Sequence, residues 1–178
     1  ADKALKNFYL SLSLSSQLKD SVGMADTYTN LGSTYQQQQD IKSADKFFLK
    51  ALNIYKKLND EGGIAIIYNN LGLLYEDYSK KELAIKYYRL SYQYWNKLDM
   101  PRYKAYSLNN IGVNLDDLGK PDSAITYHLE ALEIFKTLED NEDLAWTYNL
   151  IGRHYLDQKN FAKSELNLKK AYELSEQN

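Results

Sequence analysis

The sequence predicts an all-α fold, a solenoid in which antiparallel helix pairs stack side by side. Two observations predict it: a glycine motif recurs at a fixed interval, and apolar residues between its copies follow helical spacing. The motif reads YTNLGSTY, YNNLGLLY, LNNIGVNL and YNLIGRHY in turn. Its glycines are Gly32, Gly72, Gly112 and Gly152, so the position rises by 40 from each copy to the next. A fixed period of that size indicates stacked supersecondary units.

Each unit of this period is predicted to contain two helices. The first contains the glycine motif and opens on an alanine in a constant register. First helices are expected at 25–37, 65–77, 105–117 and 145–157. The second helix carries apolar residues at i, i+3, i+4 and i+7, the pattern of a helix that faces a core. Second helices are expected at about 41–58, 81–98, 121–138 and 161–174.

Residues that favour helix starts stand where these helices are expected to begin. Asp20, Asp60 and Asp140 are N-cap candidates, because an aspartate side chain accepts hydrogen bonds from the unpaired backbone N–H groups of a first turn. Pro101 and Pro121 suit that turn, where the missing N–H is not needed. No linker divides the chain, so the sequence predicts one domain. Its expected parts are a lone second helix at 1–20 and repeats at 21–60, 61–100, 101–140 and 141–178.

The motif glycine needs a physical reason, because glycine inside a helix costs about 1 kcal/mol relative to alanine. An alanine stands at the twelfth position after each of the first three glycines, at Ala44, Ala84 and Ala124. We expect the two helices of a repeat to cross closely at these small residues. Close packing there would offset the cost of the glycine.

The repeated motif resembles the tetratricopeptide repeat, in which aromatic-x2-Leu-Gly-x2-Tyr is followed by Ala-x3-Phe. The first full repeat fills the pattern with Tyr28, Leu31, Gly32, Tyr35, Ala44 and Phe48. The third departs from it, with Leu108, Leu115 and His128 at aromatic positions. The long unit of this chain is similar to the longer repeats of kinesin light chains, spindle polarity adaptors, bacterial peptide receptors and arrays that precede sensor histidine kinases.

The resemblance implies a right-handed superhelix whose first helices line a concave groove. It also implies which positions of each first helix face that groove. Among them are Asn69, Asn109 and Asn149, which recur at the period of the motif. In kinesin light chains the matching asparagine pairs with the backbone of an extended peptide, and an amide suits that role. Simple solvent exposure is the alternative for these three residues.

Five further groove positions are candidate contacts for a partner. Tyr106 and Trp146 are candidate aromatic anchors, and packing against the adjacent helix is the alternative. Glu76 and Asp116 belong to acidic pairs that favour a neutral or basic partner, unless they form only a solvated face. Arg153 is the only cation at these positions. Family members that bind acidic C-terminal tails need paired Lys and Arg there, so we expect no binding of such tails.

Composition argues against several other classes. The formal net charge of −2 gives no bulk attraction to nucleic acid or anionic lipid. No apolar run approaches the roughly 20 residues of a membrane-spanning helix. The absence of cysteine excludes disulfides and thiolate metal sites. The aromatic run YYRLSYQYW, residues 87–95, aligns with core positions of the first repeat, so we expect packing rather than a platform for nucleic acid.

Catalysis is not expected. His128 aligns with Phe48 and is interpreted as a core substitute, and His154 is expected between the groove and the helix interface. No nucleophile set, phosphate loop or metal-ligand spacing accompanies them, so the sequence predicts no enzyme, no cofactor and no metal.

We therefore expect a scaffold that binds a peptide segment of a partner protein in its groove. One alternative is the sensory or regulatory region of a larger signalling protein, such as a histidine kinase or transcription regulator; another is an enzyme accessory subunit. The helix at 1–20 lacks a preceding partner, and the last helix leaves an apolar side uncovered. We expect the natural protein to continue in at least one direction, or its ends to pair in an oligomer.

Overall fold

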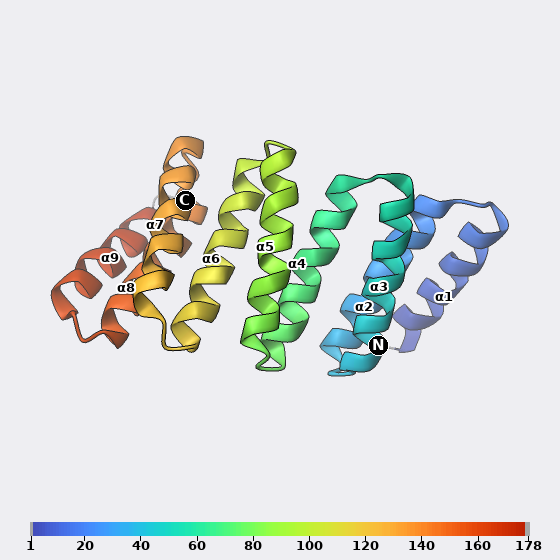
Figure 1. Cartoon of the computed structure of the whole chain (residues 1–178), viewed down its shortest axis with the longest axis horizontal. Coiled ribbons are helices and arrows are strands. Elements are labelled where there is room, and N and C mark those ends of the chain that lie inside the picture. The colour runs from blue at the N-terminus through green and yellow to red at the C-terminus, as the bar shows by residue number, and fades with distance from the viewer. Residues whose placement is uncertain (1, 177–178) are drawn as a thin grey trace. The chain divides into compact units, whose positions relative to one another are not determined.

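The computed structural model describes residues 2–176, in which all regular secondary structure is α-helical (Figure 1). The helices are α1 (Asp2–Gln17), α2 (Ser21–Gln37), α3 (Ile41–Leu58), α4 (Glu61–Asp77), α5 (Lys81–Lys97), α6 (Pro101–Asp117), α7 (Pro121–Leu138), α8 (Asn141–Asp157) and α9 (Phe161–Ser175). This confirms the predicted all-α class. The first helices begin one turn before the predicted alanines, because the N-cap residues lie further upstream.

Contacts between helices group the chain into two compact units, with the boundary in the sequence between Lys80 and Lys81. In the first unit, α2 packs on α1 and α3, and α4 packs on α3. In the second unit, α6 packs on α5 and α7, and α8 packs on α7 and α9. Within each unit, neighbours in sequence are therefore neighbours in space, as expected of stacked helix pairs. The expectation of one domain over residues 1–178 stays a prediction.

The predicted N-cap residues and first-turn prolines are confirmed. Asp20, Asp60 and Asp140 each accept a hydrogen bond from a backbone N–H in the first turn of α2, α4 and α8. Pro101 and Pro121 stand in the first turns of α6 and α7. Caps and prolines act locally, which is why the sequence alone locates them.

A left-handed residue follows each helix from α1 to α8. These residues have φ between 51° and 67° and recur at a constant interval: Lys19, Gln39, Asn59, Ser79, Asp99, Gly119, Glu139 and Lys159. This conformation closes a helix C-terminus, and it costs most residues other than glycine roughly 1 kcal/mol. The turns therefore repeat at half the period of the glycine motif. The sequence does not reveal this shorter period, since only Gly119 of the eight is a glycine.

The close helix crossing expected at the motif glycines is confirmed, but the glycine faces a ring. A Cβ atom on Gly32 would lie 2.6 Å from the ring of Phe48, and one on Gly112 would lie 2.5 Å from the imidazole of His128. Each glycine makes room for a side chain one helical turn beyond the alanine that the sequence analysis paired with it. The cost of the glycine is offset by the burial of that side chain, since Phe48 and His128 are at most 1% exposed.

The aromatic run at 87–95 packs largely as predicted. Tyr88 and Trp95 are buried, and Tyr92 and Tyr94 are half-buried. The same unit contains a buried cluster formed by Ala105, Leu108, Ala131 and Phe135, which joins α6 to α7. This cluster fixes the position of α6, which carries three of the eight predicted contact residues.

Candidate functional site

Six of the eight predicted contact residues lie on α6 and α8 in the second unit, and the other two lie on α4 in the first unit. Helices α6 and α8 each pack on α7 and also contact one another. This arrangement brings Tyr106 close to Trp146 and Asp116 close to the helical turn that contains Arg153. The predicted residues of the second unit therefore come from one pair of adjacent helices.

Asn109 does not reach the surface of that pair. Its side chain is fully buried, Nδ2 donates to Thr147 Oγ1 over 2.9 Å, and Oδ1 lies 3.0 Å from His128 Nδ1. The expectation that Asn109 faces the groove is therefore wrong, because its amide ties α6 to α7 and α8. Asn149 is exposed and Asn69 is half-buried, so a peptide contact stays a prediction for those two residues.

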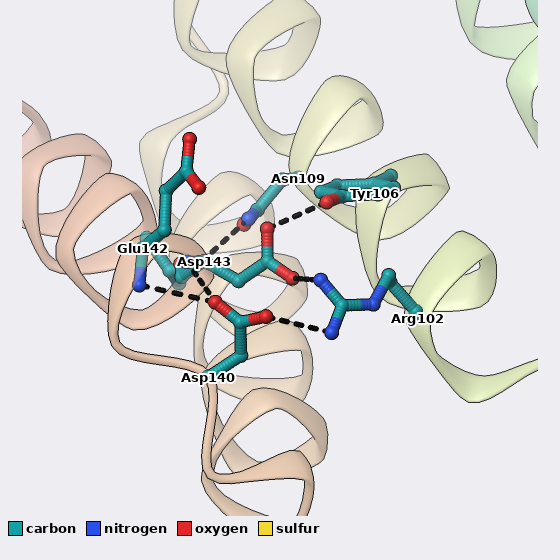
Figure 2. A network of polar contacts seen from close by, with 7 residues as sticks. Arg102, Tyr106, Asn109, Asp140, Glu142 and Asp143 are labelled. Carbon is teal, nitrogen blue, oxygen red and sulfur yellow. Dashed lines mark hydrogen bonds and ion pairs between the residues drawn. The ribbon is translucent and has the colours of Figure 1, made fainter. Parts of the chain in front are cut away.

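An ion-pair network joins the start of α8 to α6. Figure 2 shows Arg102 reaching both Asp140 and Asp143, with N–O distances of 2.7 and 2.5 Å. Tyr106 donates its hydroxyl hydrogen to the second oxygen of Asp143 over 2.6 Å. The hydrogen bond from Arg102 lowers the pKa of Asp140 below its usual value. Burial, followed by the hydrogen bond to Asp143, raises the pKa of Tyr106. The hydroxyl of Tyr106 therefore stabilises the contact between α6 and α8.

The ring of Tyr106 belongs to an aromatic cluster. Its centroid lies 5.8 Å from that of Trp146, 5.4 Å from that of Phe135 and 6.3 Å from that of Tyr103. Trp146 and Tyr103 stay 38% and 43% exposed. Tyr106 therefore packs against neighbouring helices, and Trp146 packs on it while presenting part of its indole to solvent. A role as an aromatic anchor for a partner stays a prediction for both residues.

A small cleft of about 50 Å³ lies near the C-terminal ends of α6 and α8. It is lined by Val113, Asp116, Asp117, His128, Leu150, Arg153, His154 and Asp157. Asp116 stands between two imidazoles: His154 Nδ1 lies 2.8 Å from Oδ1, and His128 Nε2 lies 3.5 Å from Oδ2. Asp117 pairs with Lys81 over 2.6 Å.

The sequence did not predict that His128 and His154 meet at the same carboxylate. The sequence did contain a signal for the contact between His128 and Asp116. Gly32 and Phe48 stand in the same register as Gly112 and His128, and Asp116 lies one turn after Gly112. The contact between His154 and Asp116 depends on how α8 packs beside α6, and no local sequence pattern predicts that packing.

In the first unit, predicted groove positions of α4 form a partly exposed stripe, the α4 stripe, made of Ile66, Asn69, Leu73 and Glu76. Ile66 and Leu73 are 46% and 38% exposed, and Asn69 and Glu76 are half-buried on the same helix. Asp77, at the end of α4, accepts a hydrogen bond from the Gln36 side chain on α2 over 2.6 Å.

Two features are absent from the residues that the structure describes. Across residues 2–176, no group of three or more His, Cys, Asp or Glu side chains is arranged to hold a metal ion. Within the same range, no helix combines the length and apolar character required to cross a membrane.

Solved structures with this fold come from several kinds of protein. The crystal structure of BtubC (BKLC) from P. vanneervenii matches with a TM-score of 0.88 and 20% identity, over 99% of this chain and 74% of that one. Aspartyl phosphate phosphatase F from Bacillus subtilis matches with a TM-score of 0.89 and 19% identity, over 97% of this chain and 45% of that one.

A signal transduction ATPase with numerous domains and a tetratricopeptide repeat sensor, from Pyrococcus horikoshii, matches with a TM-score of 0.81 and 19% identity. The match covers 87% of this chain and 24% of that one. The chain therefore spans about three quarters of BtubC but less than half of the phosphatase and the ATPase. At these identities the likeness shows the fold alone. No curated protein sequence matches the chain.

The family model for the tetratricopeptide repeat matches almost the whole chain, in four overlapping segments. They are residues 1–57, 23–97, 63–137 and 103–177. Repeats of this family are typically protein-interaction modules and generally non-catalytic scaffolds, because their stacked helices present extended surfaces. The period, the helix pairs and this match together show that the chain belongs to the tetratricopeptide repeat family.

Proposed function

We propose that this chain is a scaffold that binds an extended peptide segment of a partner protein in the concave groove that its first helices are expected to line. The observation that carries the proposal is a stripe on α8. Trp146, Asn149, Arg153 and Asp157 follow one another at spacings of three or four residues, and all four are exposed. Residues at that spacing share one helix face. That face offers an aromatic ring, an amide and both charges to a ligand.

The chemistry of this stripe favours a neutral or basic partner. Trp146 supplies apolar area for an anchor residue of the peptide, and such anchors dominate binding energy at interfaces. Asn149 offers amide donors and an acceptor to a peptide backbone. The carboxylates of Asp116, Asp117 and Asp157 outnumber the single guanidinium of Arg153 around the cleft. An acidic tail would meet unfavourable charge there.

The first unit supports the same proposal through α4. Ile66, Asn69 and Leu73 stand at the positions that correspond to Tyr106, Asn109 and Val113 in the next repeat. Exposed apolar side chains beside an amide suit contact with a peptide backbone and its apolar residues. Each unit thus contributes a stripe of its own.

A peptide-display screen on the whole chain tests this proposal. Selected peptides are measured against a double variant, Trp146→Ala with Asn149→Ala, and against the control Leu129→Ala. Leu129 is 44% exposed on α7, a second helix, so its removal matches the loss of apolar surface outside the stripe. We expect the double variant to lose binding and the control to keep it. Equal binding by both folded variants, or a screen that selects no peptide, would count against the proposal.

A second candidate function is the sensory or regulatory region of a larger signalling protein. It is supported by the match to the Pyrococcus horikoshii ATPase, in which a tetratricopeptide repeat region is described as a sensor and of which this chain covers 24%. The coding sequence on either side tests it. A kinase, ATPase or DNA-binding domain in the same reading frame would favour this candidate over a stand-alone scaffold.

A further inference from the structure

A cavity of about 360 Å³ lies between α5 and α7, where both helices pack on α6. The lining of this α5–α7 cavity includes Arg89 and Tyr92 of α5, Leu108 and Ile111 of α6, and Tyr127 and Glu130 of α7. Leu108 and Ile111 are at most 2% exposed, whereas Arg89 and Glu130 are exposed. The cavity thus has an apolar floor and a polar rim. Its volume falls within the roughly 300–1,000 Å³ that is usual for ligand sites.

The floor contains a departure from the repeat pattern, because Leu108 stands where the other repeats have a tyrosine. The corresponding residues are Tyr28, Tyr68 and Tyr148. In the first repeat, the ring of Tyr28 stacks on that of Phe47, with centroids 5.9 Å apart. The ammonium nitrogen of Lys50 lies 5.0 Å from the centroid of the same ring. The tyrosine of that motif therefore directs its ring at the second helix of its own repeat.

The third repeat keeps the neighbours of that ring without the ring itself. Tyr127 and Glu130 have the register of Phe47 and Lys50, two repeats later in the sequence. Both residues line the cavity together with Leu108. A leucine side chain is shorter than a tyrosine side chain and ends in methyl groups. The position of the cavity therefore corresponds to that of the absent aromatic ring.

The chemistry of the lining indicates what can replace this ring. Tyr92 and Tyr127 are half-buried and offer aromatic surface for stacking above the apolar floor. At the rim, Arg89 donates to the hydroxyl of Tyr127 over 3.3 Å, which is longer than most such bonds. A guanidinium only donates hydrogen bonds, and the carboxylate of Glu130 only accepts them. The phenol of a tyrosine fits both conditions, because it combines a ring with a hydroxyl that donates and accepts.

The open rim favours a protein side chain over a free small molecule. Arg89, Gln93 and Glu130 all line the cavity and are exposed, so a small ring bound there would stay partly hydrated. Ligand sites for small molecules usually bury most of the surface of the ligand. A tyrosine within a polypeptide adds contacts between its neighbouring residues and the rim. These contacts supplement the small area that a single ring buries.

We propose that the α5–α7 cavity binds a tyrosine side chain of a partner protein, whose ring takes the place of the absent motif tyrosine. This surface is separate from the predicted groove. At about 3.6 residues per turn, Leu108 and Ile111 lie on the opposite face of α6 from the groove positions Tyr106 and Val113. The inference therefore goes beyond the proposed function and adds a second binding surface to the scaffold.

The variant Leu108→Tyr tests whether the cavity accommodates the ring. It restores the residue of the other repeats, so the ring should fill the cavity and the midpoint of urea unfolding should rise. Leu166→Tyr is the matched control, because Leu166 is 55% exposed on α9 and a tyrosine there fills no cavity. The control should leave the midpoint nearly unchanged. A lower midpoint for Leu108→Tyr than for the parent chain would overturn the inference.

Binding is tested with a display library of random peptides that carry one fixed central tyrosine. Peptides are selected on the whole chain and then depleted of those that also bind Leu108→Tyr. Each selected peptide is paired with a copy in which leucine replaces the tyrosine. Dissociation constants are measured for the parent chain, for Leu108→Tyr and for the control Leu166→Tyr. They are also measured for the double variant Trp146→Ala with Asn149→Ala, which alters the α8 surface and leaves the cavity intact.

We expect the tyrosine peptides to bind the parent chain about tenfold more tightly than their leucine copies, a factor consistent with ring stacking and hydroxyl hydrogen bonds. Leu108→Tyr should lose this binding, because its own ring occupies the cavity. The control and the double variant should keep it. In methyl NMR spectra, the signal of Ile111, assigned through Ile111→Val, should move upfield in the bound chain because of the ring current of the tyrosine. This shift is measured on the parent chain.

Three results would overturn the inference even if Leu108→Tyr proved unstable. The first is equal binding of tyrosine peptides and their leucine copies, and the second is an Ile111 signal that does not move. The third is a library that yields no peptide. Loss of binding in the double variant would also count against it, because the peptides would then occupy the α8 surface. The proposed function would survive these failures, since its own screen uses peptides without a fixed tyrosine.

Discussion

Gly112 on α6 lies against the imidazole of His128 on α7, so closely that a Cβ atom would stand 2.5 Å from Cε1. Gly32 and Phe48 make the same contact in the first repeat. The helix crossing is therefore common to both repeats, and only the third brings polar atoms into it. Asn109 and Asp116, about one turn to either side of Gly112, face those atoms.

Gly112→Ala should destabilise the chain by roughly 1–3 kcal/mol, the cost of an added methyl group in a packed core. Urea unfolding measures it. Gly62→Ala is the matched control, because a Cβ atom there meets only one oxygen of Asp60, at 3.5 Å. The control should leave stability unchanged or raise it by up to about 1 kcal/mol, as helix propensity predicts. Equal effects of the two changes would contradict the role of the crossing.

Asp143→Ala should lower the free energy of unfolding by about 2–4 kcal/mol, because Arg102 and the hydroxyl of Tyr106 both lose their buried partner. Thermal or urea unfolding of the variant measures this loss. The neighbouring Glu142→Ala is the control, since the Glu142 side chain is exposed. A loss of similar size in both variants would show that the network contributes little.

Acid should weaken the contact between α6 and α8. The hydrogen bond from Arg102 holds the pKa of Asp140 below its usual 3.8 in the folded chain. A depressed folded pKa stabilises the fold above the unfolded pKa, and that contribution disappears as the pH falls from 3.8 through the folded pKa. Urea midpoints measured from neutral to strongly acidic pH should therefore fall less steeply in Arg102→Gln than in the parent chain. Parallel pH profiles would exclude this ion pair as a source of acid sensitivity.

The left-handed turn residues offer a test of the shorter period. Glu139 has φ of 52°, and Glu139→Gly should raise stability by up to about 1 kcal/mol because glycine adopts this conformation without strain. Gly119→Ala should lower it by a similar amount. No atom lies within 4 Å of a Cβ atom built on Gly119, so that change reports backbone strain alone. Opposite signs in urea unfolding are the expected result, and the same sign would contradict it.

The α-helical class, the period of the motif, the capped helix starts and the general placement of the helices were determined by the sequence itself. Each rests on local chemistry. Asp20 and Pro101 act on the turn in which they stand, and apolar spacing reports the face of one helix at a time. Such signals need no knowledge of the neighbouring helix.

Only the tertiary structure decided which groove positions are open. Asn109 and Asn149 have the same register in their repeats, yet the first is buried and the second is exposed. The difference arises because α8 places Thr147 beside Asn109, whereas no first helix follows α9 within the described residues. The meeting of His128 and His154 at Asp116 has the same origin. Side chains from three helices converge there, and their contacts depend on how the helices pack rather than on any one segment.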